Sequence, residues 1–298
     1  MSPSLPPPFP FSVMKNILVA TDFSPEAHNA FEVALQLARH NGGHLTLLHV
    51  LDTIEDSAGG FSTVGSPVGD DSINQIFSIK LIEATKRRLS ALAAEALRLA
   101  PDVPVHEAVE VARVGEGILA AIKRHTTDLV VLGARGHGAM EHFFVSSTTE
   151  RLIRLAPCPV LTVKHPHHGY EVKHIVFPSD FSAEAERALD GLRAVRAAFP
   201  EATLHLLHVA AGGCGHVAEQ QMRTFAEQHQ LGKCETAEVD ASRTSAGIED
   251  YVKQVGADLV VIPTHVRSGL SRFLQTSIAE TVATHAFPPV LTYHFAGE

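Results

Sequence analysis

Residues 15–35 read KNILVATDFSPEAHNAFEVAL, a short apolar run followed by Thr-Asp and then by a helix-like pattern. Residues 173–192 read KHIVFPSDFSAEAERALDGL and repeat that order. Continuous Val/Ile/Leu runs of this length are typical of strands buried on both faces, and Ser24 followed by Pro25 is typical of a helix cap and first turn. Ser182 stands where Ser24 does and predicts the same cap. The two stretches therefore predict the same strand, turn and helix twice.

The repetition extends through both halves of the chain. Three further pairs of blocks recur in the same order: LTLLHV at 45–50 with LHLLHV at 204–209, DLVVLG at 128–133 with DLVVIP at 258–263, and PCPVLTV at 157–163 with FPPVLTY at 287–293. A fixed order of repeated blocks indicates a tandem duplication. The predicted organisation is a disordered proline-rich leader at 1–13, a first domain at 14–164, a linker at 165–172 and a second domain at 173–298.

Each half alternates short apolar runs with longer segments of helical period. This pattern predicts an α/β fold in which each domain is a five-stranded parallel sheet with helices on both faces, similar to a Rossmann fold. Residues 84–100 have the spacing of an amphipathic helix. Residues 52–75, rich in Gly, Ser and Asp, are expected to form a long loop. The strands expected in the first half are Asn16–Ala20, His44–Val50, a segment near His106–Val111, Asp128–Leu132 and Val160–Val163.

Composition narrows the class of protein. A formal net charge of -9 argues against nonspecific binding to nucleic acid or to an anionic membrane surface. No apolar run reaches the roughly 18 residues of a membrane-spanning helix. The proline-rich start lacks the charge and apolar core of a secretory signal, and Met14, directly before the first strand, is an alternative start. With three cysteines, the simplest expectation is a reducing, cytoplasmic location.

Polar and glycine residues follow two predicted strands of the first half. Ligands of open α/β sheets bind beyond the carboxyl ends of the strands. A carboxylate after the first strand can accept hydrogen bonds from ribose hydroxyls, and it can equally stabilise the turn. Glycines after the fourth strand admit a phosphate, and hydroxyls at the next helix start suit phosphate oxygens. Arg135 is either a phosphate ligand or a surface residue. The candidates are Ala20, Thr21, Asp22, Gly133, Arg135, Gly136, Ser146, Ser147, Thr148 and Thr149.

Several catalytic and nucleotide motifs are missing from the sequence. No Gly-Lys-Ser/Thr follows the first strand, no Gly-x-Gly-x-x-Gly occurs there, and no nucleophile elbow is present. The chain is therefore not expected to be an efficient enzyme, although slow ATP hydrolysis could accompany nucleotide binding.

The ordered blocks resemble the universal stress protein family in its tandem, two-domain form. The resemblance rests on the first strand ending in Thr-Asp, on LLHV, on DLVVLGARG and on APCPVLTV. The ATP-binding branch of that family carries Gly-x-x-Gly, nine residues, then Gly and Ser/Thr. Gly133, Gly136 and Ser147 match this pattern, whereas Ser146 replaces its last glycine and adds a Cβ beside the phosphates.

The resemblance implies ATP, with or without Mg²⁺, in the first domain. By the same resemblance, Ala20, Thr21 and Asp22 would lie against adenosine, Val50 would line the adenine pocket and Leu132 would sit beside the base or ribose. The family's last strand pairs between subunits, so PVLTV and PPVLTY are expected to pair within one chain as a pseudo-dimer. A further homodimer and a protein partner remain open.

The second half keeps the spacing of the motif and loses its chemistry. Pro263, Val266 and Thr276 occupy the glycine positions and Ser277 is retained, so ATP is not expected there, and Asp180 is expected to be a turn residue. Mixed Cys and His residues suit zinc, although their spacing matches no established motif. The alternative to ATP binding is therefore a nucleotide-free sensor or interaction protein whose second domain holds another ligand. The zinc candidates are His208, Cys214, His216 and Cys234.

Overall fold

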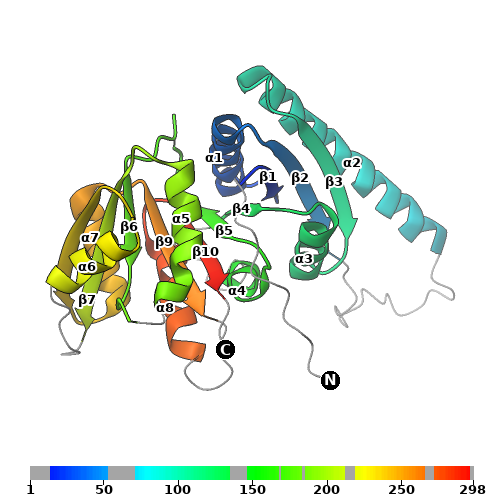
Figure 1. Cartoon of the computed structure of the whole chain (residues 1–298). Coiled ribbons are helices and arrows are strands. Elements are labelled where there is room, and N and C mark those ends of the chain that lie inside the picture. The colour runs from blue at the N-terminus through cyan, green and yellow to red at the C-terminus, as the bar shows by residue number, and fades with distance from the viewer. Residues whose placement is uncertain are drawn as a thin grey trace, which may run out of the picture.

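The structure is a computed structural model, and it describes residues 14–52, 71–134, 146–167, 169–182, 185–211, 219–265 and 272–295 (Figure 1). The first half contains β1 (Asn16–Ala20), α1 (Pro25–Asn41), β2 (His44–Leu51), α2 (Asp71–Leu99), β3 (Val105–Val111), α3 (Val114–Arg124), β4 (Leu129–Gly133), α4 (Ser146–Leu155) and β5 (Val160–Val163). The second half contains β6 (His174–Pro178), the 3-10 turn η1 (Ala185–Ala188), α5 (Leu189–Ala198), β7 (Thr203–Ala211), α6 (Glu219–Gln228), β8 (Cys234–Ala241), α7 (Thr244–Val255), β9 (Leu259–His265), α8 (Arg272–His285) and β10 (Val290–Phe295).

These strands form a single ten-stranded sheet in the order β3-β2-β1-β4-β5-β10-β9-β6-β7-β8. Neighbouring strands are parallel within each half, as the sequence predicts, and β5 and β10 are antiparallel. Leu291 lies opposite Leu161 at this junction, and the Thr162 and Thr292 hydroxyls each donate to a carbonyl of the other strand at 3.3 Å. The predicted pairing of the two final strands within one chain is therefore confirmed.

Helices cover both faces of the sheet because buried side chains alternate along the strands. Ile17 and Val19 of β1 point into a core shared with α1, α2, α5 and α6, whereas Leu18 points to the opposite side, toward α3 and α4. On that side of the second half, α7 and α8 form the matching core, which also takes in Ile153 of α4. Figure 1 shows α2 beside β3 at the outer edge of the first half.

Local signals place the ends of α1 correctly. The Ser24 hydroxyl accepts a hydrogen bond from the Ala27 amide at 3.2 Å, and Pro25 occupies the first turn. Gly42 ends the helix in the left-handed conformation, with φ 61°. The cap predicted at Ser24 is thus confirmed.

Two boundaries differ from the sequence-based prediction. Residues 71–75 belong to the start of α2, so the helix takes in the end of the expected loop. In the second half, α5 begins only at Leu189, after η1, and the Ser182 hydroxyl donates to the Asp180 carboxylate at 2.9 Å. The predicted helix cap at Ser182 is therefore wrong. The Tyr293 hydroxyl donates to the Ala188 carbonyl at 2.6 Å, a contact at the start of α5 that Val163, at the matching position of the first half, cannot make.

Candidate functional site

The strand order of the first half reverses between β1 and β4. In the sheet, β1 has β2 on one side and β4 on the other. Ala20 pairs with Leu132 at the carboxyl ends of β1 and β4. Such a switch point is where open α/β sheets bind ligands. The structure therefore brings the predicted residues after β1 and those at the end of β4 together at one position.

The turn after β1 is held by its own hydrogen bonds. The Thr21 hydroxyl accepts from the Phe23 amide and the Asp22 carboxylate accepts from the Ser24 amide, both at 2.9 Å. Phe23 has φ 63°, which only such a fixed turn sustains in a bulky residue. Asp22 is exposed. Its carboxylate thus performs the turn role that the sequence left as an alternative to ribose binding.

The second half repeats this turn without the glycines of the phosphate motif. Ser179 accepts from the Phe181 amide, Asp180 accepts from the Ser182 amide, and Phe181 has φ 52°. Asp180 is therefore a turn residue, as predicted. In both halves the aspartate therefore accepts the same backbone hydrogen bond of the turn.

A histidine that the sequence-based site prediction did not include supports the same turn. His49 Nδ1 lies 2.7 Å from the Thr21 carbonyl oxygen, and its ring stacks on Phe23 with centroids 4.8 Å apart. The Arg88 guanidinium from α2 lies 4.0 Å from the centroid of the Phe23 ring. His208 makes the corresponding contact to the Ser179 carbonyl at 3.2 Å. The recurrence of LLHV was the signal that could have revealed this role.

Gly133 is required by packing. A Cβ at this position would lie 2.4 Å from the backbone carbon of Glu26 and 2.5 Å from the Ala27 nitrogen, because the first turn of α1 lies directly against the end of β4. This close approach explains the glycine without any ligand. Glycine at this position is thus compatible with a phosphate site and is not evidence for one by itself.

The other predicted residues divide into three groups. Val50 lies against α3, where a Cβ on Gly117 would come within 2.8 Å of its Cγ1. Ser146, Ser147, Thr148 and Thr149 form the first turn of α4, so the unpaired amides of this helix start belong to them. Arg135 and Gly136 lie outside the described residues.

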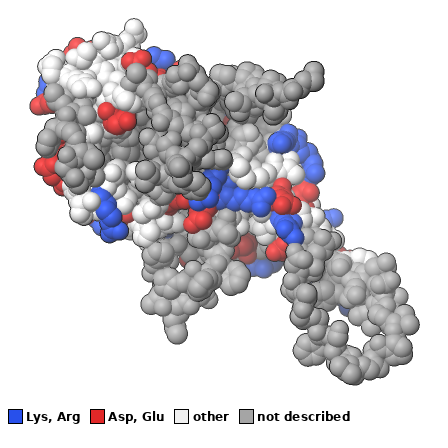
Figure 2. All heavy atoms as spheres, turned by 90° about the horizontal axis from the view of Figure 1, so that it is seen from below, with Lys and Arg blue, Asp and Glu red and all other residues white. Residues whose placement is uncertain are grey.

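Ion pairs hold α4 to its neighbours. Arg151 pairs with Glu116 of α3 at 3.2 Å, and Arg154 forms two hydrogen bonds to Glu280 of α8 in the second half. Seen from below in Figure 2, basic and acidic side chains adjoin one another on the described part of this face. The helix that follows β4 is thus fixed to both halves of the molecule.

The two zinc candidates that the structure describes, His208 and Cys234, lie apart. Cys234 is the first residue of β8 and pairs with Leu204, whereas His208 pairs with Glu238 four residues further on, about 13 Å along the strand. Cys234 and His208 therefore lie toward opposite ends of the β7–β8 pair. Cys214 and His216 lie outside the described residues and follow the carboxyl end of β7. Among the residues that the structure describes, no three His, Cys, Asp or Glu side chains form a group able to hold a metal ion.

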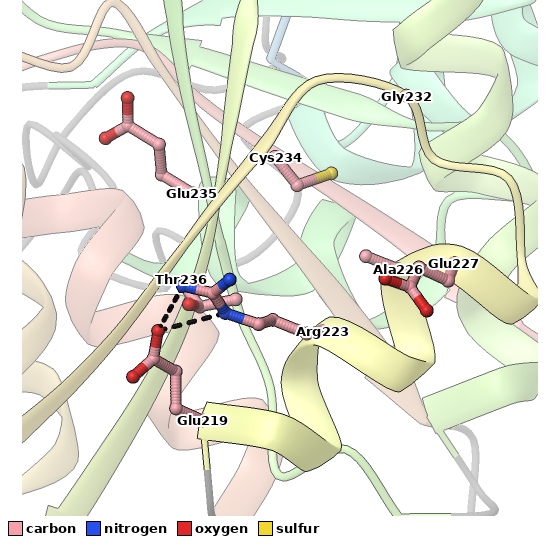
Figure 3. Close-up of a pocket in the computed structure, with 8 residues that line it drawn as sticks. All are labelled: Glu219, Arg223, Ala226, Glu227, Gly232, Cys234, Glu235 and Thr236. Atoms are coloured by element: carbon pink, nitrogen blue, oxygen red, sulfur yellow. Dashed lines mark hydrogen bonds and ion pairs between the residues drawn. The ribbon is translucent and has the colours of Figure 1, made fainter.

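Two grooves lined by described residues lie away from the switch point. One, of about 480 Å³, runs between α6 and the amino end of the outermost strand β8 (Figure 3). Glu219 and Arg223 pair across its wall at 2.6 Å, and Cys234 lines it, with burial raising the pKa of the thiol. A second, of about 420 Å³, lies between α2 and β3 and is mostly apolar. Neither coincides with the predicted site.

Comparison with known proteins decides the family. The sequence model of the protein family described as the Universal stress protein family matches residues 14–164 and 171–294 of this chain. The chain belongs to the universal stress protein family. A universal stress protein of Thermus aquaticus is 31% identical over 153 residues, covering 51% of this chain and all of that protein. A putative universal stress protein of Staphylococcus aureus is 29% identical over 154 residues, which cover 50% of this chain and 84% of the relative.

Solved structures match the whole tandem universal stress protein fold. A universal stress protein from Archaeoglobus fulgidus superposes with a TM-score of 0.70 at 16% identity, covering 94% of this chain and 98% of its own. A putative universal stress protein from Pseudomonas aeruginosa gives 0.61 at 18% identity, with 96% and 95% covered. At these identities the likeness shows the fold alone. None of the helices in the described ranges is long and apolar enough to cross a membrane.

Proposed function

We propose that this universal stress protein binds ATP, or a related adenine nucleotide, in its first half, and that the nucleotide acts as a regulatory ligand in the cytoplasm. The observation that carries the proposal is the switch point, where Ala20 pairs with Leu132 and α4 begins beyond β4. Crevices of this kind accept nucleotides because strand ends offer polar backbone groups and a helix start offers amides to phosphate.

In this proposal the residues divide by the part of the nucleotide that they meet. Ala20, Thr21 and Asp22 lie beside the adenosine, with Val50 and Leu132 near the base. Phosphate oxygens, with or without Mg²⁺, meet the first turn of α4 and the loop before it. The phosphate ligands are Gly133, Arg135, Gly136, Ser146, Ser147, Thr148 and Thr149.

The second half is proposed not to bind nucleotide. Its switch-point strands β6 and β9 pair over two positions, compared with four for β1 and β4. Pro263 stands at the position of Gly133 and has no N–H to offer a phosphate. Tyr293 replaces Val163 and fixes the start of α5 through Ala188. These differences support one nucleotide site per chain.

The switch point carries residues suited to binding. Its described side chains include no set of nucleophile, base and orienting group. We therefore propose that the nucleotide is a regulatory ligand and expect slow hydrolysis at most.

A specific observation favours a second candidate, a nucleotide-free sensor or interaction protein. Asp22 serves the turn and Gly133 serves the packing of α1, so both would be retained without nucleotide. The two candidates differ in whether the loop before α4 touches phosphate, and substitution there separates them.

The experiment compares equivalent positions of the two halves. Titration calorimetry with ATP, with and without Mg²⁺, is run on the wild type, Gly136→Val, Ser146→Gly and Thr276→Gly. ATP binding should be lost in Gly136→Val and strengthened in Ser146→Gly, which removes a Cβ beside the phosphates. Thr276→Gly is the matched control in the second half and should bind as the wild type does. Unchanged affinity in both Gly136→Val and Ser146→Gly would reject the site.

A further inference from the structure

Three positions of the second half carry titratable residues where the first half carries none. The pairs, taken from the aligned repeat blocks, are His174 with Asn16, His205 with Thr46, and Tyr251 with Ala121. These positions lie far apart in the sequence. A duplicated fold offers an internal comparison, because matched positions start from the same environment.

In the structure the three second-half residues contact one another. His174 Nδ1 of β6 lies 3.0 Å from His205 Nε2 of β7, and His205 Nδ1 lies 3.1 Å from the Tyr251 hydroxyl of α7. His205 is 2% exposed and Tyr251 is 8% exposed. The three differences between the halves therefore form one connected feature, a chain of hydrogen bonds centred on the buried His205 and reaching the half-buried His174.

The number of protons decides whether this chain holds together. A neutral imidazole has one N–H and one acceptor nitrogen, and a phenol can donate or accept, so two neutral rings satisfy every contact. One added proton is also accommodated, since His205 can donate from both of its ring nitrogens. A second proton places N–H groups on both sides of the 3.0 Å contact. Two cations then face each other with no acceptor between them.

Other charged groups surround the chain on each element. Glu235 of β8 is exposed, with its carboxylate 3.6 Å from His205 Nδ1. The Asp258 carboxylate, before β9, accepts the backbone amides of Lys173 and His174 at 2.8 Å each. Burial lowers the pKa of His205, Glu235 raises it in part, and His174 lowers it again. The exposed carboxylate therefore does not cancel the effect of burial.

We propose that the His174–His205–Tyr251 chain is an acid-sensitive contact that joins β6, β7 and α7 at neutral pH and breaks when both histidines are protonated. At the matching strand positions the first half has Asn16 and the buried Thr46. Asn16 donates to the Thr126 carbonyl at 3.1 Å. Neither side chain takes up a proton, so acid leaves the packing at these two positions unchanged. Acid would thus loosen the contact between β6, β7 and α7, which the first half makes without histidine.

The sign of the effect follows from the direction of the pKa shift. A histidine whose pKa in the fold lies below its unfolded value of 6.5 stabilises the fold fully above that value. The stabilisation is lost as the pH falls from there through the lower pKa of the folded state. The response therefore falls in the mildly acidic range.

Hydrogen exchange on the full chain tests the proposal. Between about pH 7.5 and pH 5, amide protection in β7 and α7 should be lost, since the unfolded state binds the proton that the buried His205 ring resists. Protection in β2 should hold. The fall of protection in β7 and α7 should shrink in His174→Asn, which places the first-half residue at this position. It should persist in the matched control His106→Asn. Equal falls in both halves of the wild type, or a full fall in His174→Asn, would overturn the proposal.

Imidazole NMR of the wild type decides the question if His174→Asn does not fold. The buried His205 ring should bind its proton only below the ordinary histidine pKa, because burial opposes the charge. Protonation of His205 at the ordinary value, with its contacts to His174 and Tyr251 intact, would overturn the proposal.

Discussion

Lys164 is a buried cation at the junction of the two halves, and its replacement tests how the junction is held. It follows β5 and is 5% exposed. Its ammonium donates to the Ala286 carbonyl at 2.6 Å, beyond the end of α8, and its own carbonyl accepts from the Asn29 amide group at 3.1 Å. The perturbation is Lys164→Met, which keeps the length of the side chain and removes the charge.

The expected magnitude follows from the pKa. Burial lowers the pKa of Lys164 from 10.5 to about 8, with Glu249 opposing the shift. At about 1.4 kcal/mol per pKa unit, the buried charge costs about 3 kcal/mol below pH 8. Losing the hydrogen bond to Ala286 costs roughly 1 kcal/mol. Lys164→Met should therefore raise the free energy of unfolding at pH 7 by about 2 kcal/mol.

The pH dependence carries the sharper test. A lysine whose pKa is lowered in the fold destabilises it below that pKa, and the penalty disappears as the pH rises to the unfolded value of 10.5. Urea unfolding at about pH 7 to 10.5 should thus show the advantage of Lys164→Met declining with pH and changing sign. Lys173→Met, at an exposed lysine, is the control and should show no such decline. Parallel curves for the wild type and Lys164→Met would refute this reasoning.

Two further predictions concern packing and the junction. Gly133→Ala should lower the free energy of unfolding by about 2 kcal/mol or more, because the added Cβ would meet the backbone of α1. Gly117→Ala should lower it by less, because there the added Cβ would meet only side-chain atoms. Equal losses in urea unfolding would count against this explanation of Gly133. Arg154→Met should lower the free energy of unfolding by about 1 kcal/mol. Its bidentate partner Glu280 is largely buried, while the arginine is half exposed. A Glu280→Gln background should remove most of that loss, and additive losses would contradict a direct interaction.

The fold could be predicted from the sequence because the duplicated blocks are local signals. Each strand and the cap at Ser24 depend on residues close by in the chain. The antiparallel pairing at Leu161 and Leu291 followed from the family resemblance together with the repetition of the last strand. These inferences needed no knowledge of long-range packing.

The errors have a common physical origin in contacts between distant residues. Ser182 repeats Ser24, yet the chain before α5 also contacts Tyr293, more than a hundred residues later. The packing of α1 against Gly133 is likewise a contact that the local sequence does not reveal. The place of Cys234 depended on which end of β8 it occupies, and strand register is not a local property.

The stoichiometry of ATP binding to the full chain tests the central claim most directly. Titration calorimetry of nucleotide-free protein should give one ATP per chain, since the sequence of the second half has Pro263 and Val266 where the first half has Gly133 and Gly136. Two sites per chain would contradict the asymmetry between the halves. No binding at millimolar ATP, with or without Mg²⁺, would contradict the nucleotide site itself.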